Sequence, residues 1–296
     1  MRATATTGVL VLAEPTASGR QAAWRGAVVA RELALPLCLL YARQVAAGPD
    51  AGEGAVRQLA AEIEDHLGLQ VHLELAGGDA LAAAVRAART AALLVIGSQR
   101  GNPLREFVLG TQAERLIRLC RVPVLVVKRP PQGAYRRVLV PVVLSPAART
   151  VIAAATRLSR DPRMEVLHAL HPGDELGMRA CELPEAVVRR ERLRAADRAR
   201  SRLQALLGEA AARPDAAVVA VAFGDAASLV LAREQAMRAD LVVIGKRQRA
   251  LLADFLLGSV TRRVLAAARA DVLVLPAQGR DTAGWTAVPL APGPVT

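Results

Sequence analysis

The sequence predicts an α/β protein built from two consecutive doubly wound parallel sheets, each of five strands. Three observations lead to this prediction. The length of 296 residues suits two domains of about 150 residues each. Short apolar runs alternate with helical segments, which is typical of parallel strands covered by helices on both faces. The two halves of the chain also repeat one another, so the same reasoning applies to each.

The repeat is clearest where each half ends. Residues 97–127 align with residues 245–275 without a gap, and the alignment matches glycine, leucine, phenylalanine and valine positions. Residues 8–16 match residues 137–145 in the same way, so the two halves also begin alike. This agreement indicates a duplicated domain.

Each expected element follows from the hydrophobic pattern. Apolar runs predict the strands of the first half, which are 9–12, 37–41, 71–75, 93–96 and 124–127. Amphipathic segments predict helices at 19–34, 54–67 and 111–120, with an Ala-rich helix that Asp79 caps. The second half repeats this order with a longer helix from about 183 to 212.

Four segments follow from this organisation. The first domain is expected at 1–130, and the Pro- and Gly-containing residues 131–136 form a linker. The second domain is expected at 137–278. Residues 279–296 are rich in Pro, Gly and Ala and show no periodicity, so we expect a disordered tail.

The composition limits the function classes. Aromatic residues make up only 2% of the chain, which argues against base stacking. The net charge of +12 has two interpretations, a phosphate-bearing partner or an Arg-rich solvated surface. We favour the second, because positive residues are scattered and the densest run, Arg189 to Arg202, alternates with Ala, Glu and Asp. A nucleic-acid partner is therefore disfavoured.

The cysteine pattern argues against a cross-linked or zinc-binding protein. The three cysteines are widely spaced and form no Cys-x-x-Cys or Cys/His cluster, so neither a disulfide framework nor a metal site is expected. We find no signal peptide and no uncharged apolar stretch long enough to span a bilayer. We therefore expect a cytoplasmic protein without a membrane partner.

One motif in each half has the features of an anion-binding site. A buried strand ends in Gly97 or Gly245, and a loop then leads to Gly110-Thr111 or Gly258-Ser259, which open a helix. Glycines allow close approach of a phosphate, and a helix N-terminus offers unpaired N–H groups. The alternative is helix capping alone. Thr111 with Glu114 fits a capping box, and Ser259 is expected to be an N-cap.

The order and spacing of these parts resemble the universal stress protein family in its tandem form, whose ATP-binding members carry Gly, two residues, Gly, nine residues and then Gly-Ser/Thr. The resemblance implies an adenine-nucleotide α-hydrolase-like, Rossmann-like fold, a role in stress survival, and pairing of the edge strands 124–127 and 272–275. It implies ATP as a candidate cofactor. The cofactor-binding residues it indicates are Glu14, Thr16, Ile96, Gly97, Ser98, Arg100, Gly110 and Thr111, with Ile244, Gly245, Gly258 and Ser259 in the second half.

The sequence also departs from the family pattern. Arg100 and Gln248 stand where the middle glycine is expected, and Glu14 and Val143 stand where the family usually has Asp. Arg100 either contacts a phosphate or fills its place, and we favour obstruction because a side chain on a tight turn removes room. We expect degenerate clefts, with more of the ligand chemistry lost in the second half.

No catalytic residue is predicted. The chain has neither a Gly-Lys-Ser/Thr phosphate loop nor a Gly-x-Ser-x-Gly elbow, and His168 is expected to be structural. Our main hypothesis is a non-enzymatic binding and regulatory protein with an unidentified protein partner, assembled as an intramolecular pseudo-dimer or a homodimer. The alternatives are an ATP-binding switch using the first cleft, an ATP-hydrolysing enzyme and a nucleic-acid binder.

Overall fold

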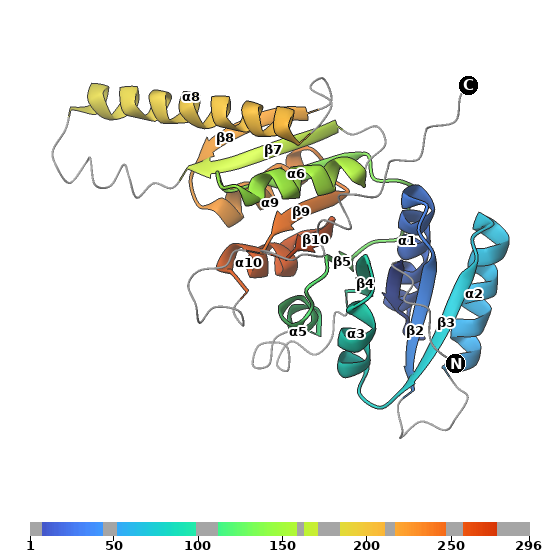
Figure 1. The fold of residues 1–296 in the computed structure, drawn as a ribbon. Helices are drawn as coiled ribbons and strands as arrows, with labels where there is room; N and C mark the ends of the chain where they lie inside the picture. Colours follow the sequence, from blue (N-terminus) through green and yellow to red (C-terminus); the bar gives the residue numbers. More distant parts are fainter. Residues whose placement is uncertain are drawn as a thin grey trace, which may run out of the picture. The chain divides into compact units, whose positions relative to one another are not determined.

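The computed structural model describes residues 8–43, 52–98, 112–158, 163–170, 184–210, 217–246 and 257–276. These residues form two compact units (Figure 1). Unit 1 holds the described residues up to Ala134, together with Lys246, Leu257 and residues 271–276. Unit 2 holds those from Tyr135 to Gly245, together with residues 258–270.

The elements alternate as the sequence predicts. Those of the first repeat are β1 (Val9–Leu12), α1 (Ala17–Leu33), β2 (Leu37–Arg43), α2 (Glu53–Leu67), β3 (Val71–Gly77), α3 (Ala80–Ala88), β4 (Leu93–Gly97), α5 (Gln112–Leu119) and β5 (Val124–Val127). Those of the second repeat are β6 (Arg137–Pro141), α6 (Ala147–Arg157), β7 (Arg163–Leu170), α8 (Glu185–Glu209), β8 (Ala217–Phe223), α9 (Ala226–Ala236), β9 (Leu241–Gly245), α10 (Ser259–Ala267) and β10 (Asp271–Leu275).

In unit 1 the strand order is β3-β2-β1-β4-β5, and all of these strands are parallel. The strand β10 then pairs antiparallel with β5, with Leu273 opposite Leu125. The predicted pairing of the two edge strands is therefore confirmed, and it lies inside unit 1. Helices α1 and α2 pack together against the strands, as do α3 and α5.

In unit 2 the strand order is β9-β6-β7-β8, again parallel throughout. Helix α6 contacts β6 and β9, and α8 contacts β7 and β8. Helices α9 and α10 contact one another. The predicted fold class, two doubly wound α/β repeats with mainly parallel sheets, is confirmed.

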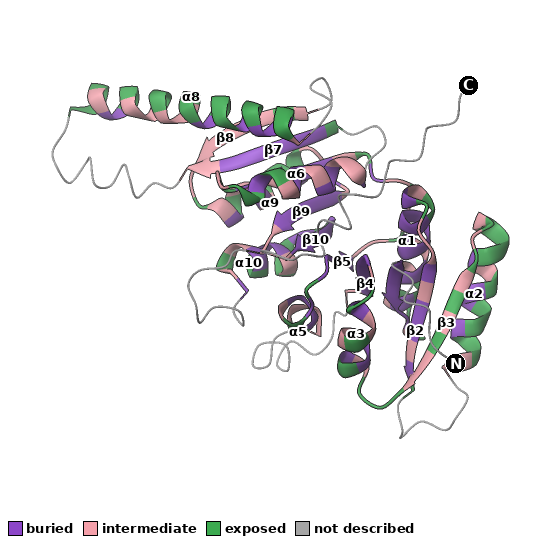
Figure 2. Ribbon diagram, in the orientation of Figure 1, coloured by how far each residue is buried: buried purple, intermediate pink, exposed green. Residues whose placement is uncertain are grey.

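Burial follows the apolar runs. The strands β1, β5 and β10 are buried at every position, whereas β3 alternates between half-buried and exposed residues (Figure 2). Central strands of a helix-covered parallel sheet are buried on both faces, which is why their sequences are almost wholly apolar. This arrangement leaves the carboxyl ends of β1, β4 and β5 as the part of unit 1 where polar groups gather.

The helix caps test two expectations. Asp79 accepts hydrogen bonds from the N–H groups of Leu81 and Ala82, so its predicted role as the N-cap of α3 is confirmed. The N-cap of α10 is Gly258, so the prediction that Ser259 caps this helix is wrong. Ser259 is instead the first helical residue, because the helix begins directly after the glycine. The predicted tail, 279–296, lies outside the described residues.

Candidate functional site

The candidate site of unit 1 lies where β1, β4 and β5 end and α1 begins. Ligands of doubly wound sheets bind beyond the carboxyl ends of the strands, near the point where the strand order reverses. In the order β3-β2-β1-β4-β5 this point lies between β1 and β4. A pocket of about 440 Å³ opens there, within the volume range of small-molecule sites. Its lining residues are Thr16, Ala17, Ser18, Gln21, Ser98 and Lys128.

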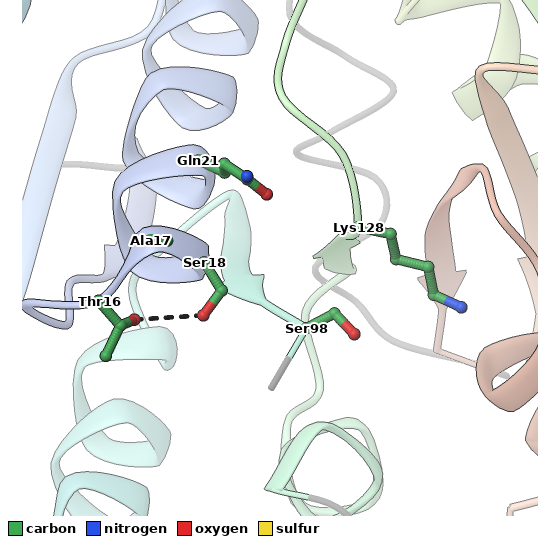
Figure 3. A pocket seen from close by; sticks show the side chains of 6 residues that line it. All are labelled: Thr16, Ala17, Ser18, Gln21, Ser98 and Lys128. Carbon is green, nitrogen blue, oxygen red and sulfur yellow. Dashed lines mark hydrogen bonds between the residues drawn. The ribbon is translucent and has the colours of Figure 1, made fainter. Parts of the chain in front are cut away.

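The first turn of α1 forms one wall of this pocket. Thr16 is the N-cap, and its Oγ1 accepts a hydrogen bond of 3.0 Å from the N–H of Gly19. The hydroxyl groups of Thr16 and Ser18 lie 3.2 Å apart (Figure 3). The first N–H groups of a helix have no partner within it, and the positive end of its dipole favours an anion. This wall therefore offers hydroxyl and backbone donors to a negatively charged ligand.

The opposite wall comes from the ends of β4 and β5. Ser98 follows β4 and is held by its N–H, which donates to the carbonyl oxygen of Val127 at 2.8 Å. Lys128 follows β5, and its side chain extends away from α1 in the close view (Figure 3). The N–H of Lys128 donates to Oδ1 of Asp271 at 2.8 Å, which fixes the backbone at this corner. The pocket thus combines hydroxyl groups, a helix N-terminus and a cation.

Close packing between β4 and α1 brings these walls together. A Cβ atom built on Gly97 would lie 2.7 Å from the carbonyl oxygen of Ser18, so only a glycine allows the strand end to approach the helix this closely. The sequence predicted that Gly97 allows a phosphate to approach the backbone closely. In this structure the neighbour that requires the glycine is the backbone of α1.

The structure brings together only part of the predicted site. Thr16 and Ser98 line the pocket, and Gly97 lies beside Ser98. Ile96 is 3% exposed and belongs to the core of the sheet. Glu14 is half-buried and does not line the pocket. The remaining predicted residues of this half lie outside the described residues, namely Arg100, Gly110 and Thr111.

Sequence reasoning missed four lining residues, Ala17, Ser18, Gln21 and Lys128. A signal for Lys128 was present, because it directly follows a predicted strand and ligands bind at the carboxyl ends of parallel strands. Ser18 and Gln21 carry no such signal. They reach the pocket because α1 begins at Ala17, earlier than the periodicity of the sequence indicates.

The second repeat uses the corresponding positions differently. Lys246 occupies the place of Ser98, and its N–H donates to the carbonyl oxygen of Leu275 in the same way. Its Nζ donates to the carbonyl oxygen of Arg118 at 3.2 Å, in the last turn of α5. The helix α6 has Pro146 as its N-cap and no side-chain cap, where α1 has Thr16. Ser145, which aligns with Thr16, thus does not cap its helix, and a lysine replaces the serine at the end of the strand.

The other predicted residues of the second repeat do not gather around a ligand. Ile244 is 5% exposed and lies in the core. A Cβ atom on Gly245 would lie 3.1 Å from Cγ2 of Val151, so this glycine packs against a side chain of α6. A Cβ atom built on Gly258 would have no neighbour within 4 Å. Ser259 is exposed.

His168 is 9% exposed, and its Nδ1 lies 2.9 Å from the carbonyl oxygen of Val142. The prediction of a hydrogen-bonded structural histidine is confirmed. Among the residues that the structure describes, no group of three His, Cys, Asp or Glu side chains is placed to hold a metal ion. No helix in that part of the chain is long and apolar enough to cross a membrane.

Two thiols are held in the protonated form. Burial, with the nearby carboxylate of Glu74, raises the pKa of Cys38 from 9.0 to about 11. Burial also raises the pKa of Cys120 from 9.0 to about 11, although the charge of Lys246 acts in the opposite direction. A thiol that stays protonated at neutral pH is a poor nucleophile and a poor metal ligand.

These shifts predict a pH dependence. Because the folded protein holds the thiol protons up to about pH 11 and the unfolded chain releases them near 9.0, their stabilising contribution is complete below pH 9 and is lost between about 9 and 11. Thiolate absorbance of a Cys181→Ser variant, followed during a pH titration, should rise with a midpoint near 11. A midpoint near 9 would show that the thiols are solvated.

Comparison with known proteins agrees with the repeat and the fold. The model of the universal stress protein family matches residues 9–128 and again residues 134–276. The chain is similar to a functionally unknown protein from Pseudomonas aeruginosa PAO1, with 21% identity, a TM-score of 0.67 and 95% of each chain covered. It is also similar to a universal stress protein from Archaeoglobus fulgidus DSM 4304, with 15% identity, a TM-score of 0.63, and 92% of this chain and 99% of that chain covered.

Proposed function

The chain belongs to the universal stress protein family, and on this premise we propose that its first repeat binds an adenine nucleotide as a regulatory ligand that it does not hydrolyse. The observation that supports this proposal is the pocket of about 440 Å³ at the switch point of unit 1. The phosphates of a nucleotide suit the donors there. The hydroxyl groups of Thr16, Ser18 and Ser98 and the first turn of α1 are suited to phosphate oxygens.

The second repeat is proposed to have no ligand. Lys246 is hydrogen-bonded to the end of α5 and does not reproduce the hydroxyl group of Ser98. Ser145 aligns with Thr16 but makes no capping hydrogen bond at the start of α6. We infer that the second repeat supports the assembly and that the chain binds one nucleotide.

Native mass spectrometry with added ATP and magnesium tests this proposal. We expect one nucleotide per chain and a rise in Tm, because a ligand present at 100 times its Kd stabilises the folded state by about 2.7 kcal/mol. Lys128→Ala should reduce this rise to less than half, since it removes the cation of the pocket. A chain that stays empty at millimolar ATP would overturn the proposal.

The matched control is Ser259→Ala, which alters an exposed predicted residue of the second repeat. It should leave the rise in Tm unchanged. Turnover is tested separately by measuring phosphate release against a heat-inactivated sample. Release that exceeds this background and disappears in Lys128→Ala would show an enzyme and contradict the regulatory role.

A further inference from the structure

The helix α8 of unit 2 differs sharply from its counterpart in unit 1. Helix α2 lies between the second and third strands of the first repeat, and α8 holds the same place in the second. Helix α2 has 15 residues, with four acidic residues and one arginine, a net charge of −3. Helix α8 has 25 residues, with seven arginines and four acidic residues, a net charge of +3. Neither the extra length nor the positive charge is required by the fold.

The N-terminal part of α8 packs more loosely than the rest, although Arg192 lies 4.9 Å from the ring centre of Phe223 at the end of β8. Between Val188 and Ala199 no residue of the helix is buried, and most of its buried residues lie in the C-terminal half. Figure 1 shows this part extending past the ends of β7 and β8, and Figure 2 shows that it is largely exposed. The exposed side of these turns is therefore free to contact a partner.

The helical geometry gathers arginines that are scattered in the sequence. An α-helix rises about 1.5 Å per residue, so residues four apart are about 6 Å apart along the axis and neighbours on one face. Arginines recur at this spacing on the face away from the buried side chains, and all four are exposed. We call them the arginine stripe: Arg190, Arg194, Arg198 and Arg202.

The charges of the stripe are only partly compensated. Arg194 forms an ion pair of 2.7 Å with Glu191, while Asp197 pairs with Arg200, which lies off the stripe. Helix α8 contains no lysine. This matters because the planar guanidinium group binds phosphate oxygens in a bidentate manner and is less strongly hydrated than an ammonium group.

We propose that the arginine stripe binds the phosphate backbone of a nucleic-acid duplex without reading its sequence. Phosphates of one strand follow one another at about 3.4 Å along the duplex axis. A duplex therefore presents closely and regularly spaced negative charges, and the long side chains of exposed arginines can reach successive phosphates. The scarcity of aromatic residues, 2% of the chain, fits contacts to phosphates rather than to bases.

Two other occupants fit less well. The acidic helix α2 of a second copy has the opposite charge, but Glu53, Glu62 and Glu64 already bond within their own chain. A membrane surface requires a large apolar face, and Leu193 is the large hydrophobic residue that α8 exposes among those described. An acidic protein lacks the regular spacing of phosphates.

The test is fluorescence anisotropy of a labelled 20-base-pair DNA duplex across a range of salt concentrations. We expect binding at low salt that weakens steeply as salt rises. The variant with the four stripe arginines changed to alanine should bind about 10- to 100-fold more weakly at low salt. The slope of log K against log salt should fall by about three to four, because each phosphate contact contributes about 0.9. Alanine favours helices, so α8 should persist, as circular dichroism would show.

The matched control replaces four exposed arginines elsewhere with alanine, namely Arg86, Arg89, Arg121 and Arg149. Its net charge equals that of the stripe variant, and it should retain the affinity and slope of the unmodified protein. An equal loss of affinity for the duplex in both variants would show that the net positive charge alone attracts DNA, and it would overturn the proposal. So would an absence of binding at low salt, or competition by polyglutamate as effective as that by unlabelled duplex.

Discussion

Replacing Asp271 with alanine is expected to lower the free energy of unfolding by about 3–5 kcal/mol. Nε of Arg25 lies 3.1 Å from Oδ2 of Asp271, and the two side chains are 4% and 0% exposed. Removing the carboxylate leaves the guanidinium group buried without its counter-charge. It also removes the acceptor of the Lys128 N–H group. Urea denaturation followed by circular dichroism measures the loss.

Two further variants distinguish this ion pair from an ordinary surface contact. Arg263 pairs with Asp225 at 2.7 Å, but these side chains are 51% and 55% exposed. Arg263→Ala should therefore cost less than about 1 kcal/mol. The double variant Arg25→Met with Asp271→Leu should recover only part of the lost stability, because an apolar pair needs no counter-charge but leaves the N–H of Lys128 without its acceptor. A cost below 1 kcal/mol for Asp271→Ala would show that the buried pair contributes little.

The ion pair also explains how β10 is held in unit 1. Arg25 lies on α1, and its Nη1 donates to the carbonyl oxygen of Gly133 at 2.6 Å. Asp271 begins β10, so α1, the segment after β5 and the last strand of the second repeat meet at one buried charge pair. The antiparallel pairing of β5 with β10 covers two strand edges that would otherwise be open to aggregation.

The sequence predicted the pairing but not the charges that secure it. The pairing was expected from the resemblance to the universal stress protein family, and an apolar edge strand also needs a partner. Arg25 lies in an amphipathic helix, where periodicity predicts which face is buried but not which charge will be neutralised there. A contact between residues 25 and 271 depends on the fold as a whole, and neither local pattern reveals it.

The candidate site was predicted from the glycine motif of each repeat and from the family resemblance. Thr16 and Ser98 were expected because of the resemblance to the universal stress protein family. Lys128 was not predicted, because it lies outside the glycine motif. Gly97 was singled out for a phosphate, and the structure shows that the backbone of Ser18 also requires a glycine there, a contact that the sequence does not reveal.

Gly97→Ala should affect both stability and ligand binding. Its Cβ atom would lie 2.7 Å from the carbonyl oxygen and 2.8 Å from the carbonyl carbon of Ser18, and backbone atoms cannot rotate away as a side chain can. Either β4 or the first turn of α1 must therefore move. We expect a loss of about 1–3 kcal/mol in the free energy of unfolding, as for other overpacked positions. The displacement also separates the hydroxyl groups of Ser18 and Ser98, so the ATP-induced rise in Tm should disappear.

Gly245→Ala is the matched control, because the second repeat has its glycine at the same point of the fold. Here the new atom would lie 3.1 Å from Cγ2 of Val151, a methyl group that can shift by a few tenths of an ångström. The free energy of unfolding should change by no more than about 1 kcal/mol in either direction, since alanine also restricts the unfolded chain. The rise in Tm with ATP should remain. If both variants lose the ATP-induced rise in Tm, the two clefts act together. If both variants keep the rise, the nucleotide does not bind between α1 and β4.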